Sequence, residues 1–314
     1  MKLFYAFFRL IRWPNLVFIA LTQSLFYYCI ILPVLPAGYY LLNSALTPPL
    51  FYLLMTASIF IAAAGYIIND YFDINIDQIN KPEKMVVEKI INRRWAILLH
   101  WMITTAGLII SLFVAYKTSY IIFFSNVLCT LLLWFYSTTF KKKLLSGNII
   151  ISALTAWTVL VLYFATNNSY NFNSHLSAEI ANSLKRIFKF SILYGGFAFI
   201  ISLIREVVKD IEDLEGDAKN NCKTMPVVWG IRTSKVFAGV WLVVLIGVLF
   251  ILQFYAFQMG WHLIDFYCLI LVVLPLIFIL RKLYQAQNKA DYHAISKLIK
   301  LVMLTGILSI VFFR

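Results

Sequence analysis

The residues best suited to chemistry are aspartates that repeat with one spacing at two places in the chain. In the first cluster, Asp70 is followed by aspartates three and seven positions later, and in the second cluster the same spacing begins at Asp210, 140 positions further on. At about 100° per residue, this spacing places three carboxylates within roughly 60° of one helix face. The six aspartates are Asp70, Asp73, Asp77, Asp210, Asp213 and Asp217.

Such crowded carboxylates predict a bound cation, because like charges on one helix face destabilise the helix. Oxygen ligands without histidine or cysteine favour Mg²⁺, Mn²⁺ or Ca²⁺ over zinc or copper. Mg²⁺ typically combines one or two carboxylates with substrate phosphates. We therefore expect the two clusters to hold two or more ions with a diphosphate between them. The alternative is a pair of solvated helices whose acids pair with nearby lysines.

Basic residues flank both clusters. Lys81 and Lys84 follow the first cluster, Arg205 and Lys209 precede the second, and Lys141 opens a run of three lysines. Cations beside metal-binding acids suit a substrate that carries condensed phosphates. For any one lysine the alternative is a determinant of membrane topology that meets anionic lipid headgroups.

The composition predicts an integral membrane protein. Apolar residues make up 62% of the 314 residues and charged residues 13%, whereas soluble chains contain about 45–50% and about 25%. This excludes a water-soluble globule, a disordered chain and a secreted disulfide scaffold. The net charge of +13 is explained by cytoplasmic loops rich in Lys and Arg, so we expect no nucleic-acid partner.

Apolar runs of roughly bilayer length recur nine times, without the alternation of strands, and predict an all-α, multi-pass protein with residues 1–314 in a single domain. Most of the 27 Lys and Arg fall in segments on one side if the N-terminus is inside. The rule that cytoplasmic loops are basic then predicts a cell (inner) membrane protein with a cytoplasmic N-terminus and acidic clusters and an outside C-terminus. The expected spans are Leu16–Leu35, Phe51–Ile68, Ala96–Tyr116, Tyr120–Phe135, Ile149–Ala165, Ile187–Ile204, Val236–Phe257, Phe266–Leu280 and Ile295–Phe313.

At these residues the chain resembles the UbiA superfamily of intramembrane prenyltransferases. Residues 69–77 match the family's N-D-x-x-D-x-x-x-D signature, and residues 213–217 match its D-x-x-x-D signature. The segment 12–15 resembles the Arg and Asn pair that opens the first helix, and Tyr136 with Lys141 resembles an element after the fourth helix. The resemblance implies nine transmembrane helices around a central cavity, capped by the segments after the second and sixth helices.

The implied activity is Mg²⁺-dependent transfer of an isoprenyl group from a prenyl diphosphate to a lipid or aromatic acceptor. Asp70, Asp73 and Asp213 would be catalytic. The implied metal ligands are Asn69, Asp70, Asp73, Asp77, Asp210, Asp213 and Asp217. The implied diphosphate-binding residues are Lys81, Lys84, Lys141, Arg205 and Lys209, and the implied substrate-pocket residues are Arg12, Asn15 and Tyr136.

Three segments resemble the digeranylgeranylglyceryl phosphate synthase branch, namely residues 77–84, residues 205–217 and the pair Gly147 and Asn148. Residues 85–88 depart from the P-[IL]-P-S-G of those relatives, and lysine replaces arginine at Lys84, which loses the bidentate fork.

The leading expectation is a geranylgeranyl donor and a polar-lipid acceptor such as geranylgeranylglyceryl phosphate. The alternatives are a quinone-pathway enzyme with a dihydroxynaphthoate or hydroxybenzoate acceptor and, in another class, a divalent-cation transporter. The transporter is disfavoured because most of the 14 acids lie at one surface. The sequence leaves the oligomeric state open.

Overall fold

The computed structural model describes residues 2–36, 39, 46–80, 82–167 and 178–313. These residues form α-helices joined by short turns, and the described part contains no β-strand beyond one isolated bridge, between Val87 and Ile91. The all-α prediction is confirmed. The chain divides into two compact units, residues 1–140 with 157–193 and residues 141–156 with 194–314. The prediction of a single domain stays a prediction.

Nine helices among the described residues are long and apolar enough to cross a membrane, as the sequence predicts. Each expected span lies inside one of them or extends past it by a single residue. Several helices begin earlier than expected because a polar residue or a proline starts them outside the apolar run. The nine are Trp13–Val34, Pro48–Phe72, Arg93–Lys117, Tyr120–Thr138, Ser146–Thr166, Ala178–Glu212, Met225–Gln258, His262–Gln285 and Lys289–Phe313.

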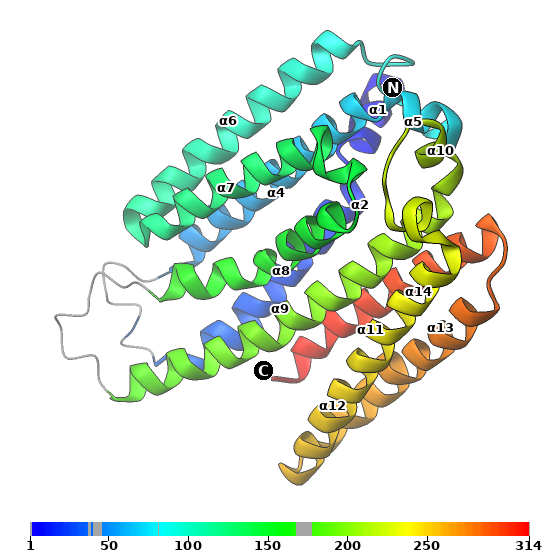
Figure 1. Cartoon of the computed structure of the whole chain (residues 1–314). Helices are drawn as coiled ribbons and strands as arrows, with labels where there is room; N and C mark the ends of the chain where they lie inside the picture. Colours follow the sequence, from blue (N-terminus) through cyan, green and yellow to red (C-terminus); the bar gives the residue numbers. More distant parts are fainter. Residues whose placement is uncertain (1, 37–38, 40–45, 81, 168–177, 314) are drawn as a thin grey trace. The chain divides into compact units, whose positions relative to one another are not determined.

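In the first unit, α4 (Pro48–Phe72) is the central helix and packs against α2 (Trp13–Phe26), α6 (Arg93–Lys117) and α7 (Tyr120–Thr138) (Figure 1). A Cβ placed on Gly107 of α6 would lie 3.1 Å from Phe60 Cβ of α4. The close approach of these two helices therefore depends on a glycine. A short helix, α1 (Lys2–Leu10), precedes α2.

In the second unit, the end of α9 (Ala178–Glu212) shares an apolar core with α11 (Met225–Gln258), α13 (Leu274–Gln285) and α14 (Lys289–Leu308). Ile204, Val207, Val208 and Ile211 are buried in this core and fall on one face of α9 at helical spacing. At 100° per residue, residues 205, 206, 209 and 210 therefore lie on the opposite face of the helix.

Both aspartate clusters lie at a break between two helices. Asp73 (φ −87°, ψ 1°) separates α4 from α5 (Ile74–Asn80), and Asp213 (φ −95°, ψ 7°) separates α9 from α10 (Leu214–Lys219). The prediction that each cluster lies on one uninterrupted helix is therefore wrong at its middle residue. Aspartate is a weak helix former in helix interiors, because its side chain competes for backbone hydrogen bonds.

The two breaks share the same hydrogen bonds. Asp73 N donates to Asn69 O (3.0 Å) and Asp77 N donates to Asp73 O (2.8 Å). In the second cluster, Asp213 N donates to Lys209 O (2.9 Å) and Asp217 N to Asp213 O (3.2 Å). The spacing that repeats in the sequence thus corresponds to a repeated local backbone structure.

Candidate functional site

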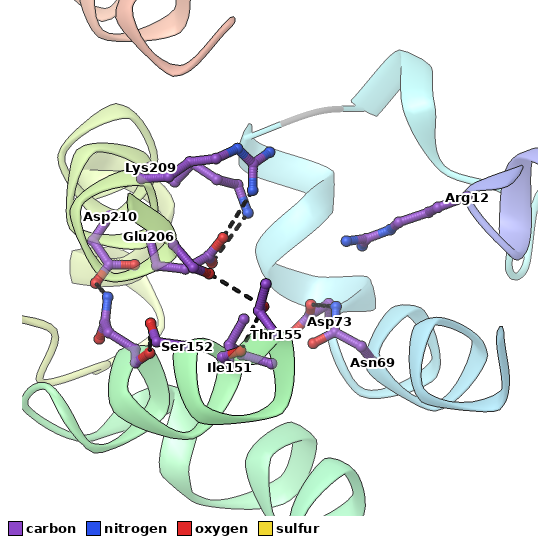
Figure 2. Close-up of polar contacts among 12 residues, drawn as sticks. Arg12, Asn69, Asp73, Ile151, Ser152, Thr155, Glu206, Lys209 and Asp210 are labelled. Carbon is purple, nitrogen blue, oxygen red and sulfur yellow. Dashed lines mark hydrogen bonds and ion pairs between the residues drawn. The ribbon is translucent and has the colours of Figure 1, made fainter. Parts of the chain in front are cut away.

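The first cluster is built around a buried amide–carboxylate pair at the end of α4. Asn69 Nδ2 donates a 2.7 Å hydrogen bond to Asp73 Oδ2, and the two residues are 7% and 3% exposed (Figure 2). Asp70 is partly buried on the last turns of α4, and Asp77 lies on α5. The structure thus places Asn69, Asp70 and Asp73 within five consecutive residues at one helix end, with Asp77 on the helix that follows.

Arg12, an expected substrate-pocket residue, binds Asp70 of this cluster. Its Nη2 donates a 2.6 Å hydrogen bond to Asp70 Oδ1, and its guanidinium lies 5.1 Å from the centre of the Tyr66 ring. Burial acts to lower the pKa of Arg12, but the charge of Asp70, the ionisable Tyr66 hydroxyl and the hydrogen bond to Asp70 outweigh it, so the net shift of the pKa is upward. Arg12 is therefore a fixed cation in this part of the site.

The other expected pocket residues occupy helix ends. Asn15 is half-buried in the first turn of α2, where its backbone N–H donates to Arg12 O (2.8 Å). Tyr136 is half-buried near the end of α7. The sequence alone did not predict that Arg12 and Asp70 would form an ion pair.

The segment after the first cluster is held by basic residues that the sequence did not single out. Lys81 lies outside the described residues, and Lys84 ends the turn Pro82–Lys84. Arg9 Nη2 donates to Glu83 O (2.8 Å), and Lys89 Nζ donates to Pro82 O (2.6 Å). Two cations thus fix the backbone of this turn.

The second cluster draws its contacts from α8 (Ser146–Thr166) and from the start of α11. Asn148 Nδ2 donates to Asp210 Oδ2 (2.8 Å), and Thr224 Oγ1 donates to Asp217 Oδ2 (3.2 Å). Asp217 is buried, whereas Asp210 and Asp213 are partly buried. Two of the three aspartates are therefore oriented by polar side chains of other segments.

Glu206 is a functional candidate that the sequence analysis missed. It is 9% exposed, and it accepts hydrogen bonds from Arg205 Nη1 (2.9 Å) and Lys209 Nζ (3.4 Å), two expected diphosphate-binding residues (Figure 2 labels Glu206 and Lys209). The available signal was its position, since Lys209 follows three residues later on the same helix. Lys141, the other expected diphosphate-binding residue of this unit, is half-buried in the turn Phe140–Lys142.

The first cluster has a donor set that fits a hard cation. An ionised carboxylate only accepts hydrogen bonds, so the amide nitrogen of Asn69 must face Asp73. Asn69 Oδ1 is buried and accepts no hydrogen bond from any residue that the structure describes. An amide oxygen beside carboxylates suits Mg²⁺ or Ca²⁺. Across the described residues, however, no three Asp, Glu, His or Cys side chains gather closely enough to hold an ion by themselves.

The fold and these side chains define a class, namely helical membrane proteins with acidic and basic residues at helix ends. The family model for the UbiA prenyltransferase family matches residues 30–304. The chain belongs to the UbiA prenyltransferase family, and it is a multi-pass membrane prenyltransferase.

Comparisons with individual proteins agree. A relative from Methanosphaera stadtmanae named digeranylgeranylglyceryl phosphate synthase is 27% identical over 255 residues, which are 80% of this chain and 83% of the relative. A solved structure from work on digeranylgeranylglyceryl phosphate synthase in membranes aligns with a TM-score of 0.62 and 24% identity, covering 99% of both chains. A UbiA homolog from Archaeoglobus fulgidus, solved with DMAPP and Mg²⁺, aligns with a TM-score of 0.56 and 16% identity, covering 97% of this chain and 98% of the homolog. At these identities the two structures show the shared fold.

Proposed function

We propose that this protein transfers a geranylgeranyl group from its diphosphate to a polar-lipid acceptor of the geranylgeranylglyceryl phosphate kind. The observation that carries the proposal is the matched pair of aspartate clusters, each with its middle aspartate at a helix break. Similarity to the relative named digeranylgeranylglyceryl phosphate synthase extends over most of the chain and supports this acceptor class.

We propose that Mg²⁺ is the cofactor and that the carboxylates of both clusters hold it. The ligands would be Asn69, Asp70, Asp73, Asp77, Asp210, Asp213 and Asp217, among which Asp70, Asp73 and Asp213 are the catalytic set. The buried Oδ1 of Asn69, which has no hydrogen-bond donor among the described residues, supports this assignment. When bound, Mg²⁺ neutralises charge on the diphosphate and so eases its departure.

Basic side chains are proposed to bind the diphosphate. Arg205 and Lys209 already lie beside Glu206, which holds them as an oriented pair on one face of α9. A preorganised cation stabilises developing negative charge better than one that must reorient. Lys141 and the two lysines after the first cluster, Lys81 and Lys84, complete the set. Arg12, Asn15 and Tyr136 are assigned to the substrate pocket, where Arg12 also neutralises Asp70.

The apolar helices are proposed to shelter the prenyl chain, because excluding water protects a reactive allylic centre from hydrolysis. We also propose that the N-terminus and both clusters face the cytoplasm and that the C-terminus lies outside. The support is the excess of Lys and Arg in the segments that would then be cytoplasmic.

Turnover by purified protein in detergent tests the proposal. Radiolabelled geranylgeranyl diphosphate is supplied with geranylgeranylglyceryl phosphate, dihydroxynaphthoate or hydroxybenzoate in parallel. We expect a labelled product with the glyceryl phosphate only, lost on adding EDTA and restored by Mg²⁺. A product with an aromatic acid alone would refute the acceptor, and turnover that survives EDTA would refute the metal assignment.

A further inference from the structure

Asn148, near the start of α8, contacts the first aspartate of the second cluster. Its Nδ2 lies 2.8 Å from Asp210 Oδ2, although the two residues are 62 positions apart in the sequence (Figure 2 shows Asp210 and its contact). Asn148 is 8% exposed, and its backbone carbonyl accepts a 2.6 Å hydrogen bond from Ser152 Oγ. Because a carboxylate only accepts, the orientation of the amide is fixed with its nitrogen toward Asp210.

Comparison of the two clusters shows why this amide comes from another helix. In the first cluster Asn69 precedes Asp70 directly and donates to Asp73. The position 140 residues later is occupied by Lys209, which contacts Glu206 instead. The second cluster therefore has no amide at the repeated position. Asn148 supplies an amide to that cluster from α8.

The equivalent aspartates Asp70 and Asp210 also differ in charge compensation. Asp70 is bound by the guanidinium of Arg12, which cancels its charge. Asp210 accepts its hydrogen bond from a neutral amide, which orients the carboxyl group but supplies no countercharge. Hydrogen-bonded neighbours of metal-binding carboxylates commonly set ligand orientation and metal affinity.

We propose that Asn148 is a positioning residue that holds the Asp210 carboxylate by Oδ2 and so presents Oδ1 to a divalent cation. Asn148 itself touches neither the ion nor the substrate. The inference rests on the proposed function, in which Asp210 is a metal ligand.

The test measures thermal stabilisation by the metal rather than turnover. Purified protein is held at a fixed concentration of geranylgeranyl thiolodiphosphate, which reacts poorly, and its Tm is followed as Mg²⁺ is added. A ligand that binds only the folded state raises Tm by an amount set by its concentration relative to Kd. The Mg²⁺ concentration that gives a fixed rise in Tm, called the midpoint below, therefore reports Mg²⁺ affinity. Asn148→Leu keeps a similar volume and removes the donor. It should raise the midpoint by about tenfold or more, as is typical for loss of such a neighbour.

Two further variants separate positioning from folding. Asn148→Gln retains the amide and should recover part of the lost affinity. Asn126→Leu is the matched control, because Asn126 is also a buried amide donor, 2.8 Å from Ser111 Oγ. It should lower the Tm of the metal-free protein but leave the Mg²⁺ midpoint within about twofold. An equal shift of the midpoint in Asn148→Leu and Asn126→Leu would overturn the proposal.

A double-mutant cycle distinguishes this inference from the proposed function. In an Asp210→Ala background, Asn148→Leu should shift the midpoint no further, because its effect passes through Asp210. If Asp210→Ala weakens Mg²⁺ binding while Asn148→Leu does not, the metal assignment stands and the positioning role fails. If neither Asp210→Ala nor Asp213→Ala changes the midpoint, the metal assignment itself fails and the positioning role falls with it.

Discussion

Arg12 reaches from the junction of α1 and α2 to Asp70 at the end of α4, and its Nη2 lies 2.6 Å from Asp70 Oδ1. The backbone of Arg12 has φ 50° and ψ 52°, a left-handed conformation that is uncommon for a residue with a side chain. The residue with this conformation is the one that neutralises Asp70, a proposed metal ligand. Backbone strain of this kind often accompanies functional sites.

Replacement of Arg12 tests whether this ion pair serves catalysis. Arg12→Ala removes the charge and both contacts, and it leaves the Asp70 carboxylate without its guanidinium. Hydrogen bonds to charged groups contribute about 1.5–3 kcal/mol, which corresponds to a loss of roughly 10–100-fold in kcat/KM. Steady-state kinetics with the prenyl diphosphate measure this loss. Arg94→Ala, an exposed arginine outside the site, is the control and should change kcat/KM less than twofold. Wild-type kcat/KM in Arg12→Ala would contradict the role.

The helices could be predicted from the sequence because burial in a bilayer requires long apolar runs whatever their neighbours. Two features depended on local backbone structure and were missed. The sequence placed the seventh span at Val236, whereas α11 begins at Met225 and is interrupted at Gly230, whose φ of 81° is accessible mainly to glycine. The breaks at Asp73 and Asp213 were hidden because an i, i+3, i+7 spacing is also compatible with one continuous helix.

The site residues could be named from their motifs, but their partners could not. The contacts of Arg12 with Asp70 and of Asn148 with Asp210 each join helices far apart in the sequence. Such pairs are set by packing, which a single sequence does not record. Glu206 illustrates the same limit, because an acid among five others in one segment becomes distinctive only when two cations converge on it.

The matched backbones of Asp73 and Asp213 predict matched losses on substitution. Asp73→Asn and Asp213→Asn preserve size and remove the charge of a proposed ligand. Since even neighbours of metal ligands contribute about 10–100-fold, each variant should lose more than about 100-fold in kcat. The rate of prenyl transfer at saturating Mg²⁺ measures the effect, and an unchanged Tm shows that the fold is retained. Full activity in either purified variant would remove that aspartate from the catalytic set.

We expect that loss of the Glu206 carboxylate lowers the stability of the folded protein more than loss of an exposed ion pair does. Glu206→Ala leaves Arg205 and Lys209 without their common acceptor on a partly buried face of α9. The expected cost is about 1–3 kcal/mol in the free energy of unfolding, seen as a Tm lower by several degrees in detergent. Glu215→Ala is the control, because Glu215 forms an exposed pair with Lys219 and exposed pairs contribute little. Equal Tm values for the two variants would show that Glu206 does not contribute to the stability of the folded protein.

Replacing a glycine by alanine should change Tm in opposite directions at Gly107, where α6 packs on α4, and at Gly247 of α11. In Gly107→Ala the new Cβ would meet Phe60 Cβ at 3.1 Å, and because that atom is attached to the backbone of α4 the two helices must move apart. Overpacking of this kind costs about 1–3 kcal/mol, which outweighs the gain of about 1 kcal/mol from replacing glycine within a helix. At Gly247 of α11 a Cβ would meet no atom of the described residues within 4 Å, so Gly247→Ala should keep only the gain. Thermal unfolding of the two variants should therefore show a lower Tm for Gly107→Ala and an equal or higher Tm for Gly247→Ala. A Tm for Gly107→Ala at or above that of the wild type would mean that α4 and α6 can separate without cost, and the close helix contact would not be needed for stability.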